Sequence, residues 1–506
     1  MTSSDVAKVP PQGKSSAGFL DLLRNRNYSL LWWGQLVSEL GNRLHWVAIS
    51  LWIFSETRSA SAVSIAISSM FAGSLLVSLW AGVTADYFDR RKIMVISDLV
   101  RAVLVALVPF LMGVSIWLVY LDLILISMAT AFFRPALFSV IPQVVKRNNL
   151  LPANSFMSVM DTGTEVAGPA LAGIVAAKFG YAPLLYLDAG TYLVSALCIV
   201  AMTIPSAVIE AARKIDPRGV WEGVQEGIQY IRKDSLQWGL FVLLLPVALV
   251  GASLNALQTP LAKGVIGISD PEFGSFQAIW GIGFVVASFL LGWYGTRVQR
   301  HLLVLAGYFL VFVAAALMGL SGSFSTLAAA AFAVGFANTL YYVGLNTTIM
   351  EHSPQHMLGR VISTRQLAIG MVRVVAPLLL GLLADAVGTR ETIVAVALVG
   401  AALTVAILIA FPATRRFETR PIETGDTKNT LWRALAGQIN PQFDRSQQYR
   451  LSAVSILIAL FAWLGLAFAL PAYALGLLVF IPMFVLFDFA RKKAGFARGE
   501  VKQGGN

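Results

Sequence analysis

The sequence predicts an all-α integral membrane protein with twelve membrane-spanning helices in two halves of six, followed by a C-terminal hydrophobic hairpin of two further helices. Three observations lead to this fold class. Hydrophobic residues make up 57% of the 506 residues and charged residues only 13%, so most of the surface must face lipid. Apolar segments long enough to cross a bilayer recur along the chain, and parts of the second half repeat patterns of the first.

The composition also excludes several classes of protein. A disordered, fibrous or secreted disulfide-bonded protein does not fit this apolar content, and the single Cys198 has no partner within the chain. The formal charge of +11 would suggest nucleic acid for a soluble protein. In a membrane protein, the first question is on which side of the bilayer the basic residues lie.

The first part of the chain is a tail and six predicted spans. Residues 1–26 are polar and basic and indicate a cytoplasmic tail, because they contain no apolar core of a signal peptide. A span needs roughly 20 mostly apolar residues. The spans of the N-terminal bundle, 27–204, are Asn27–Phe54, Ser61–Ala85, Ile93–Gly113, Ser115–Phe133, Ser155–Ala177 and Leu184–Ile204.

The second part mirrors the first and carries an extension. A cytoplasmic loop at 205–237, with a predicted amphipathic surface helix, precedes the C-terminal bundle at 238–411. A cytoplasmic linker (412–450), a hydrophobic hairpin (451–490) that either spans or re-enters, and a cytoplasmic tail (491–506) follow. The spans of this bundle are Trp238–Leu257, Phe276–Tyr294, Leu302–Leu320, Phe324–Ile349, Val361–Ala386 and Thr392–Phe411.

The basic residues predict the orientation. With the N-terminus inside, 30 of the 38 lysines and arginines fall in cytoplasmic segments and four fall in outside loops. The positive-inside rule therefore places both termini in the cytoplasm. The bias also accounts for the net charge without nucleic acid.

Two internal matches indicate a duplication. Residues 165–180 match residues 373–388 at an offset of 208, with proline and glycine positions in step. The segment AGVTADYFDRRKIMV after the second span matches LGWYGTRVQRHLLV after the eighth at an offset of 210. Because both matches lie at equivalent places in the topology, we expect a parallel repeat of six plus six helices.

The loop after the second span carries a recognisable motif. Its sequence, GVTADYFDRRK from Gly82 to Lys92, resembles the signature loop of the major facilitator superfamily. The resemblance implies a gating loop formed by Gly82, Asp86, Arg90 and Arg91, whose charges latch the two halves together. Alternatively, the basic residues serve only to fix the topology.

A second motif lies in the fifth span. Gly163, Gly168, Pro169 and Gly173 resemble the helix-bend motif of antiporters and exporters in that superfamily. The runs MLGRVIS (357–363) and AFFRPA (131–136) look closest to the branch of bacterial macrolide-efflux and enterobactin-exporter proteins. The sequence departs from drug antiporters near residue 126, where their basic residue is missing.

Charged residues inside the spans are candidates for function because a charge in the bilayer is costly. Asp161 and Glu165 lie one turn apart without a basic neighbour in their helix, so they are the leading proton-coupling candidates. Glu39 is the third candidate, and it shares a helix face with Arg43, so these two charges are expected to neutralise each other.

The other polar residues within the spans fall into three groups. The substrate-cavity candidates are Arg43, Arg373, Asn338, Tyr341 and Asn346. Asp98 and Arg101 are expected to pair. Three acids near the outer span ends are expected to be reached by water and are weaker candidates for function: Asp122, Asp188 and Asp385.

No pattern indicates an enzyme, a metal site or a cofactor. His352 and His356 are four residues apart, but Pro354 between them argues against a regular helix that would present both to a metal. No glycine-rich phosphate loop with a lysine is present in the sequence, so ATP hydrolysis is not expected.

The leading hypothesis is a secondary transporter of the bacterial inner membrane that works by alternating access. It would be a proton-coupled exporter of a small amphipathic molecule, such as a drug or a siderophore, and its partners would be substrate, protons and lipid. A monomer suffices for this fold. The alternatives are a lipid or lysolipid flippase and a non-transporting membrane sensor or assembly partner.

Overall fold

The computed structural model describes residues 19–146, 149–203, 217–294 and 298–415, and these residues form helices without a β-strand. The all-α character of the predicted fold is confirmed for this part of the chain. Residues 1–18 of the predicted N-terminal tail (1–26), the C-terminal hairpin at 451–490 and the residues from 416 onward on either side of it lie outside the described residues. The rest of the predicted tail is largely helical, as α1 (Phe19–Arg24).

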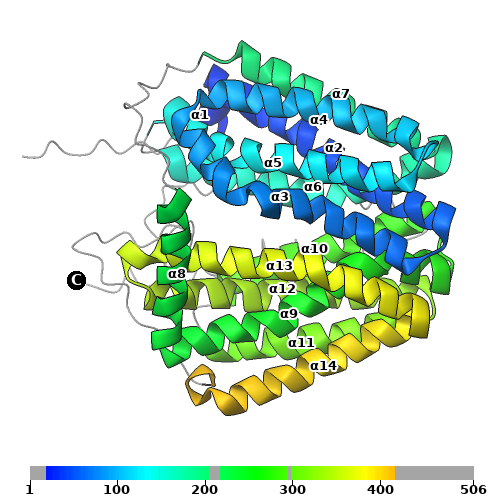
Figure 1. The fold of residues 1–506 in the computed structure, drawn as a ribbon, viewed down its shortest axis with the longest axis vertical. Helices are drawn as coiled ribbons and strands as arrows, with labels where there is room; N and C mark the ends of the chain where they lie inside the picture. Colours follow the sequence, from blue (N-terminus) through cyan, green and yellow to red (C-terminus); the bar gives the residue numbers. More distant parts are fainter. Residues whose placement is uncertain (1–18, 147–148, 204–216, 295–297, 416–506) are drawn as a thin grey trace, which may run out of the picture.

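Two groups of long helices lie side by side (Figure 1). A short helix, α1 (Phe19–Arg24), precedes the first group, here called the N-bundle, which is drawn in blue to cyan. Its helices are α2 (Arg26–Thr57), α3 (Ala60–Tyr87), α4 (Arg90–Met112), α5 (Ile116–Val144), α6 (Leu150–Phe179) and α7 (Ala182–Ala201).

The second group, the C-bundle, is drawn in green to yellow. Between the bundles, α8 (Pro217–Lys233) crosses one end of the molecule, and the end away from it is called the distal end (Figure 1). The C-bundle contains α9 (Ser235–Thr259), extended by a π-helical turn (Pro260–Ile266), α10 (Asp270–Tyr294), α11 (Arg300–Leu320), α12 (Phe324–His352), α13 (Gln355–Val387) and α14 (Thr389–Ala410).

Polar residues at the helix starts explain where many helices begin. Asn25, Ser59, Asp89, Ser115 and Asp234 each accept backbone N–H groups in the first turn of the helix that follows. These N–H groups have no partner inside the helix, so each cap contributes about 1 kcal/mol.

Ten helices in the described residues are long and apolar enough to cross a bilayer. The helices α2 and α6 are not among the ten, although they contain 32 and 30 residues. These two helices carry the proton-coupling candidates Glu39, Asp161 and Glu165, whose charges lower the hydropathy. Large apolar side chains such as Phe110 and Trp117 are exposed on the described surface, as expected for contact with lipid.

The end of α5 differs from the prediction. The fourth span was predicted to end at Phe133, but α5 continues to Val144. The helix passes through Pro135 because the residues beyond it are apolar and bury Val140 in the core. Packing therefore outweighs the hydrogen bond that the proline removes, and Arg134 belongs to the helix.

The two bundles pack their helices in the same order. In the N-bundle, α2 contacts α6 and α7, α3 contacts α5, and α4 contacts α5 and α7. In the C-bundle, α9 contacts α13 and α14, α10 contacts α12, and α11 contacts α12 and α14. Two seams join the bundles, α3 with α13 and α6 with α10.

Glycines allow close contact at both seams. A Cβ atom on Gly173 of α6 would lie 2.5 Å from the carbonyl oxygen of Asp270 and 3.0 Å from Cα of Gly274, both in α10. A Cβ atom on Gly381 of α13 would lie 2.5 Å from Oγ of Ser64 in α3. The helix backbones therefore approach one another without room for side chains.

A carboxylate reinforces the α3–α13 seam at the distal end. Asp385 of α13 accepts hydrogen bonds from Oγ of Ser59 at 2.8 Å and from the backbone nitrogens of Ala60 at 2.7 Å and Ser61 at 3.1 Å. The start of α3 is the positive end of its helix dipole, which favours a carboxylate there. Asp385 thus fastens the C-bundle to the first turn of α3.

The amphipathic helix expected in the inter-bundle loop is present as α8, and it docks on the C-bundle. Glu226 of α8 forms an ion pair with Arg360 of α13, and the hydroxyl of Tyr230 donates to the carbonyl of His352 at 3.2 Å. A Cβ atom on Gly227 would lie 2.9 Å from the carbonyl oxygen of Arg360, so the two helices also touch through their backbones.

Replacing Gly173 with alanine is expected to destabilise the protein by about 1–3 kcal/mol, because the new methyl group would press on the backbone of α10. The matched control is Gly190→Ala in α7, where a Cβ atom meets nothing within 4 Å. Thermal unfolding in detergent would compare the two. Equal unfolding temperatures for both variants would show that the α6–α10 contact is not tight.

Candidate functional site

A cavity of about 300 Å³ lies inside the N-bundle, between α2, α3, α4, α5, α6 and α7. Its wall combines charged groups, hydroxyls, aromatic rings and methionines. The charged and polar lining residues are Gln35, Ser38, Glu39, Asn42, Arg43, His45, Ser74, Arg101, Ser127, Thr130, Arg134, Asp161 and Tyr192. This mixture suits a ligand that has both an apolar body and polar groups.

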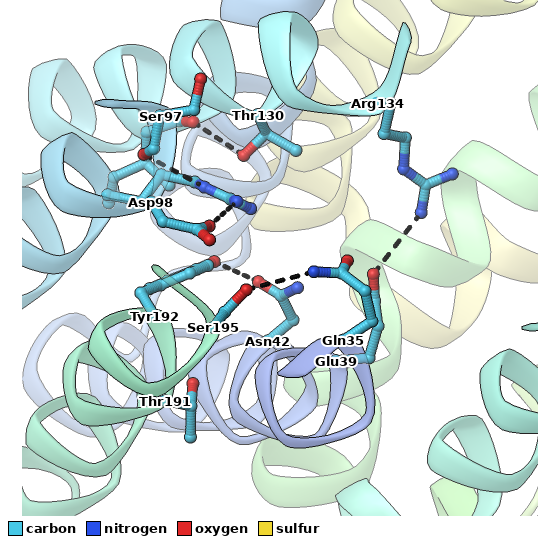
Figure 2. A network of polar contacts seen from close by, with 12 residues as sticks. Gln35, Glu39, Asn42, Ser97, Asp98, Thr130, Arg134, Thr191, Tyr192 and Ser195 are labelled. Atoms are coloured by element: carbon cyan, nitrogen blue, oxygen red, sulfur yellow. Dashed lines mark hydrogen bonds and ion pairs between the residues drawn. The ribbon is translucent and has the colours of Figure 1, made fainter. Parts of the chain in front are cut away.

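Two carboxylates, Glu39 and Asp161, line this cavity together with arginines, and a third carboxylate, Glu165, lies beside one of those arginines. Arg134 Nη2 lies 3.9 Å from Oε1 of Glu39, a contact that Figure 2 shows between α5 and α2. Arg43 Nη1 lies 4.0 Å from Oε1 of Glu165 on α6. Asp161 is exposed and lines the same cavity. The carboxylates thus share the site with cations from other helices.

These pairs differ from the arrangement predicted from the sequence. Glu39 and Arg43 were expected to neutralise each other within α2, but each has a partner on another helix. Asp161 and Glu165 have no basic neighbour in α6, yet packing brings Arg43 of α2 close to Glu165. The reason is that an α-helix surface is shared with several neighbours, and spacing along one helix does not reveal them.

Gly168 makes room for the side chain of Arg43 at this site. A Cβ atom there would lie 2.4 Å from Cβ of Arg43, so the stem of Arg43 rests on the bare backbone of α6. Pro169 and Gly173, further along α6, lie at the α10 seam, where a Cβ atom on Gly274 would come within 2.4 Å of the Pro169 carbonyl oxygen. Gly163 is half-buried in the same helix.

A buried arginine forms one wall of the cavity. Arg101 of α4 is 3% exposed and forms an ion pair with Asp98, as expected from their spacing. Its guanidinium lies between the rings of Phe133 and Tyr192, at 4.4 and 4.3 Å from the ring centroids. Cation–π contacts of this kind stabilise a desolvated arginine. The sequence did not predict that Arg101 would reach the cavity.

Neutral hydrogen bonds surround this ion pair in Figure 2. The hydroxyl of Tyr192 on α7 donates to Oδ1 of Asn42 on α2. Nε2 of Gln35 donates to Oγ of Ser195 at 3.1 Å, again between α2 and α7. These bonds hold the polar wall in place.

Two acids that the sequence placed near water are buried. Asp188 of α7 is 0% exposed and Asp122 of α5 is 4% exposed, so the expectation that water reaches both is wrong. Oδ2 of Asp188 lies 3.2 Å from Nδ1 of His45 on α2. Neighbouring helices cover the distal starts of α5 and α7, which hydropathy along a single helix does not show.

The second-half candidates lie elsewhere. The cavity lining comes from the N-bundle and includes none of Arg373, Asn338, Tyr341 and Asn346. The Arg373 guanidinium lies 5.3 Å from the ring centroid of Phe71, so it reaches across the α3–α13 seam. Asn346 accepts from Arg365 Nη1 at 3.1 Å. Tyr341 is buried against Tyr308, and Asn338 is half-buried in α12.

The motif loop between α3 and α4 is described in part. The side chains of Gly82 and Asp86 lie outside the described residues. Arg90 begins α4, and Asp89 is its N-cap. The Arg91 guanidinium donates to the carbonyls of Ile199 and Val200 at the end of α7, a contact within the N-bundle.

Comparison with known proteins gives a consistent result. The family model described as Major Facilitator Superfamily matches residues 31–265 and, again, residues 247–496. Macrolide efflux protein A of Streptococcus pyogenes is 26% identical over 372 residues, which cover 71% of this chain and 90% of that protein. Multidrug efflux pump Tap of Mycobacterium bovis is 23% identical, covering 79% and 97%.

The fold also resembles solved transporter structures. One is a bacterial homologue of the human lysosomal transporter Spinster in an inward-facing, unoccupied conformation, with a TM-score of 0.63 and 14% identity. The alignment covers 77% of this chain and 99% of that chain. At this identity the likeness shows the fold alone.

Proposed function

This chain belongs to the Major Facilitator Superfamily and is a membrane transporter, and on that premise we propose that it exports a small amphipathic molecule by alternating access, driven by protons. The observation that carries the proposal is the cavity in the N-bundle, where carboxylates, arginines and aromatic rings surround about 300 Å³. Export is supported by the similarity to proteins named for macrolide and multidrug efflux.

We propose twelve spans arranged as a six-plus-six repeat. The identical packing order of the two bundles supports this arrangement. The two seams also support it, because Gly173 and Gly381, which are 208 residues apart, occupy equivalent positions in them. The helices α2 and α6 would complete the count, since 30 residues of helix measure roughly 45 Å, more than the bilayer core.

We propose that α8 lies in the cytoplasm, together with both termini. The excess of basic residues in the predicted inside segments supports this orientation. With that orientation, the contacts of the two seams at the distal end would lie on the outer side. A lipid substrate would instead require a lateral opening between the bundles.

The transport proposal predicts active efflux of a macrolide. Cells that produce the protein are expected to accumulate less radiolabelled erythromycin than cells with an empty vector, and a protonophore is expected to abolish the difference. Purified protein in liposomes should then move erythromycin against its gradient when a pH gradient is imposed. Absence of any flux in liposomes with folded protein would overturn the transport proposal for this substrate.

The coupling role of the α6 acids predicts a specific defect. The double variant Asp161→Asn, Glu165→Gln is expected to lose gradient-driven flux, because the proposal assigns the coupling proton to these two acids, whose hydration would change as the transporter alternates between its conformations. Exchange at equal pH should remain. The control is Glu56→Gln, an exposed carboxylate on α2. A double variant with unchanged pH dependence would show that these acids do not carry the proton.

A further inference from the structure

A second group of titratable side chains lies between the cavity and the distal end. His45 of α2 lines the cavity, and its Nδ1 lies 3.2 Å from Oδ2 of Asp188 on α7. Asp122 of α5 interacts electrostatically with the same imidazole. All three side chains are at most 4% exposed. We call His45, Asp122 and Asp188 the histidine–aspartate cluster.

The position of the cluster along the helices places it on the distal side of the cavity acids. Asp122 and Asp188 each lie six residues from the distal start of their helix, roughly 9 Å along the axis. Glu39, in contrast, lies 18 residues before the distal end of α2, roughly 27 Å along it. The cluster therefore lies between the distal end and the carboxylates of the cavity.

The polar atoms of the cluster are incompletely paired. Nε2 of His45 and Oδ2 of Asp122 are buried without a hydrogen-bond partner among the described residues. An unpaired polar group in a protein interior lowers the stability of the fold. Such groups therefore point to a function that offsets this loss. An imidazole between two carboxylates offers both a proton donor and proton acceptors.

The surrounding packing is built around Asp188. A Cβ atom on Gly41 of α2 would lie 2.4 Å from Oδ1 of Asp188 and 2.2 Å from Oγ1 of Thr191, so the missing side chain makes room for both. Oγ1 of Thr191 also donates to Oδ1 of Asp188 at 3.3 Å. The carboxylate is therefore held in place on two sides.

The nearby charges do not neutralise the cluster. From α4, Arg101 interacts with Asp188, but its guanidinium is bonded to Asp98. From α7, Tyr192 is a further titratable neighbour, and residues 60–84 of α3 include no titratable residue. With a neutral imidazole, the cluster would hold two buried negative charges. Because each buried ion costs several kcal/mol, the cluster favours bound protons.

We propose that the histidine–aspartate cluster is a proton-binding site that relays protons between the distal side and the carboxylates of the cavity. The site deepens the proposed proton-driven export, on which its physiological role rests. Binding of a proton by the cluster itself is independent of any substrate. The relay passes one proton from a carboxyl or the imidazolium to a neighbouring base, so no other reactant is needed.

Infrared difference spectroscopy of the protein in liposomes tests the site without substrate. Between acidic and alkaline buffer, the wild type is expected to lose a carbonyl stretching band of a buried protonated carboxyl, with a shift in heavy water. Asp188→Asn, Asp122→Asn and His45→Gln are each expected to remove or displace that band. The matched control Glu56→Gln, on the same helix as His45, should keep it.

The outcomes are separable from those for the transport proposal. A band that is absent in wild type, or unchanged in all three variants, overturns the proton site whatever the flux shows. If the Asp188 variant does not fold, the Asp122 variant decides, because Oδ2 of Asp122 makes no hydrogen bond to the described part of the chain. If the band depends on the cluster but the protein moves no erythromycin, the proton site is supported and only the export proposal is overturned.

The relay itself is tested in a protein that does transport. There, Asp122→Asn should lose gradient-driven flux, and retained proton coupling would overturn the relay.

Discussion

Replacing Arg101 with methionine is expected to destabilise the N-bundle by about 3–5 kcal/mol, the cost of removing one partner of a buried ion pair. Asp98 would keep its burial, with 0% of its surface exposed, but lose its cation. Methionine fills much of the space between the rings of Phe133 and Tyr192, so the loss reports on charge more than on volume. A lower midpoint of thermal unfolding in detergent would measure it.

The double variant Asp98→Asn, Arg101→Met separates the two causes. Since the uncompensated carboxylate is removed as well, we expect it to recover much of the lost stability. Lys92→Met is the matched control, because Lys92 is an exposed cation on the same helix. A single variant as stable as this control would mean that the buried pair contributes nothing to folding.

Replacing Asp385 with asparagine is expected to open the distal end. The carboxylate accepts three hydrogen bonds at the start of α3, and a bond to a charged group contributes about 1.5–3 kcal/mol. The side-chain amide of asparagine would direct its own N–H groups toward the backbone N–H donors of α3. It would also lose the negative charge that the start of the helix favours. Even one such bond shifts the conformational equilibrium about tenfold.

Spin labels at Glu56 and Ala386, on the two sides of this seam, would measure the shift as a growing population of longer distances. Glu391→Gln is a suitable control, since Glu391 is an exposed carboxylate in the first turn of α14. Identical distance distributions for the wild type and the Asp385 variant would show that the seam does not depend on this carboxylate. Gradient-driven transport should fall together with the loss of the closed population.

The helices were predictable because lipid imposes one simple rule. A run of apolar residues must satisfy its backbone within a helix, so composition alone located these segments. The break at Pro354 between α12 and α13 was equally visible, because a proline cannot donate and restricts the residue before it. The continuation of α5 past Pro135 was not visible, because buried packing of residues such as Val140 sustains it.

The members of the site were more predictable than their partners. Glu39, Arg43 and Asp161 stood out as charges within apolar segments, and all three line the cavity. Their pairing depends on how helices turn against one another, which a period of 3.6 residues does not encode. For the same reason Asp122 and Asp188 were undervalued, since burial at a helix end depends on its neighbours.

The contact between Gly168 and Arg43 has a consequence for natural variation. Because the arginine stem rests on a position without a side chain, even a methyl group at 168 would displace the guanidinium from Glu165. A substitution at residue 168 would therefore change the pairing of Arg43 without altering any charged residue or any residue of the cavity wall. A comparison of related sequences that considers only the wall residues would overlook this glycine.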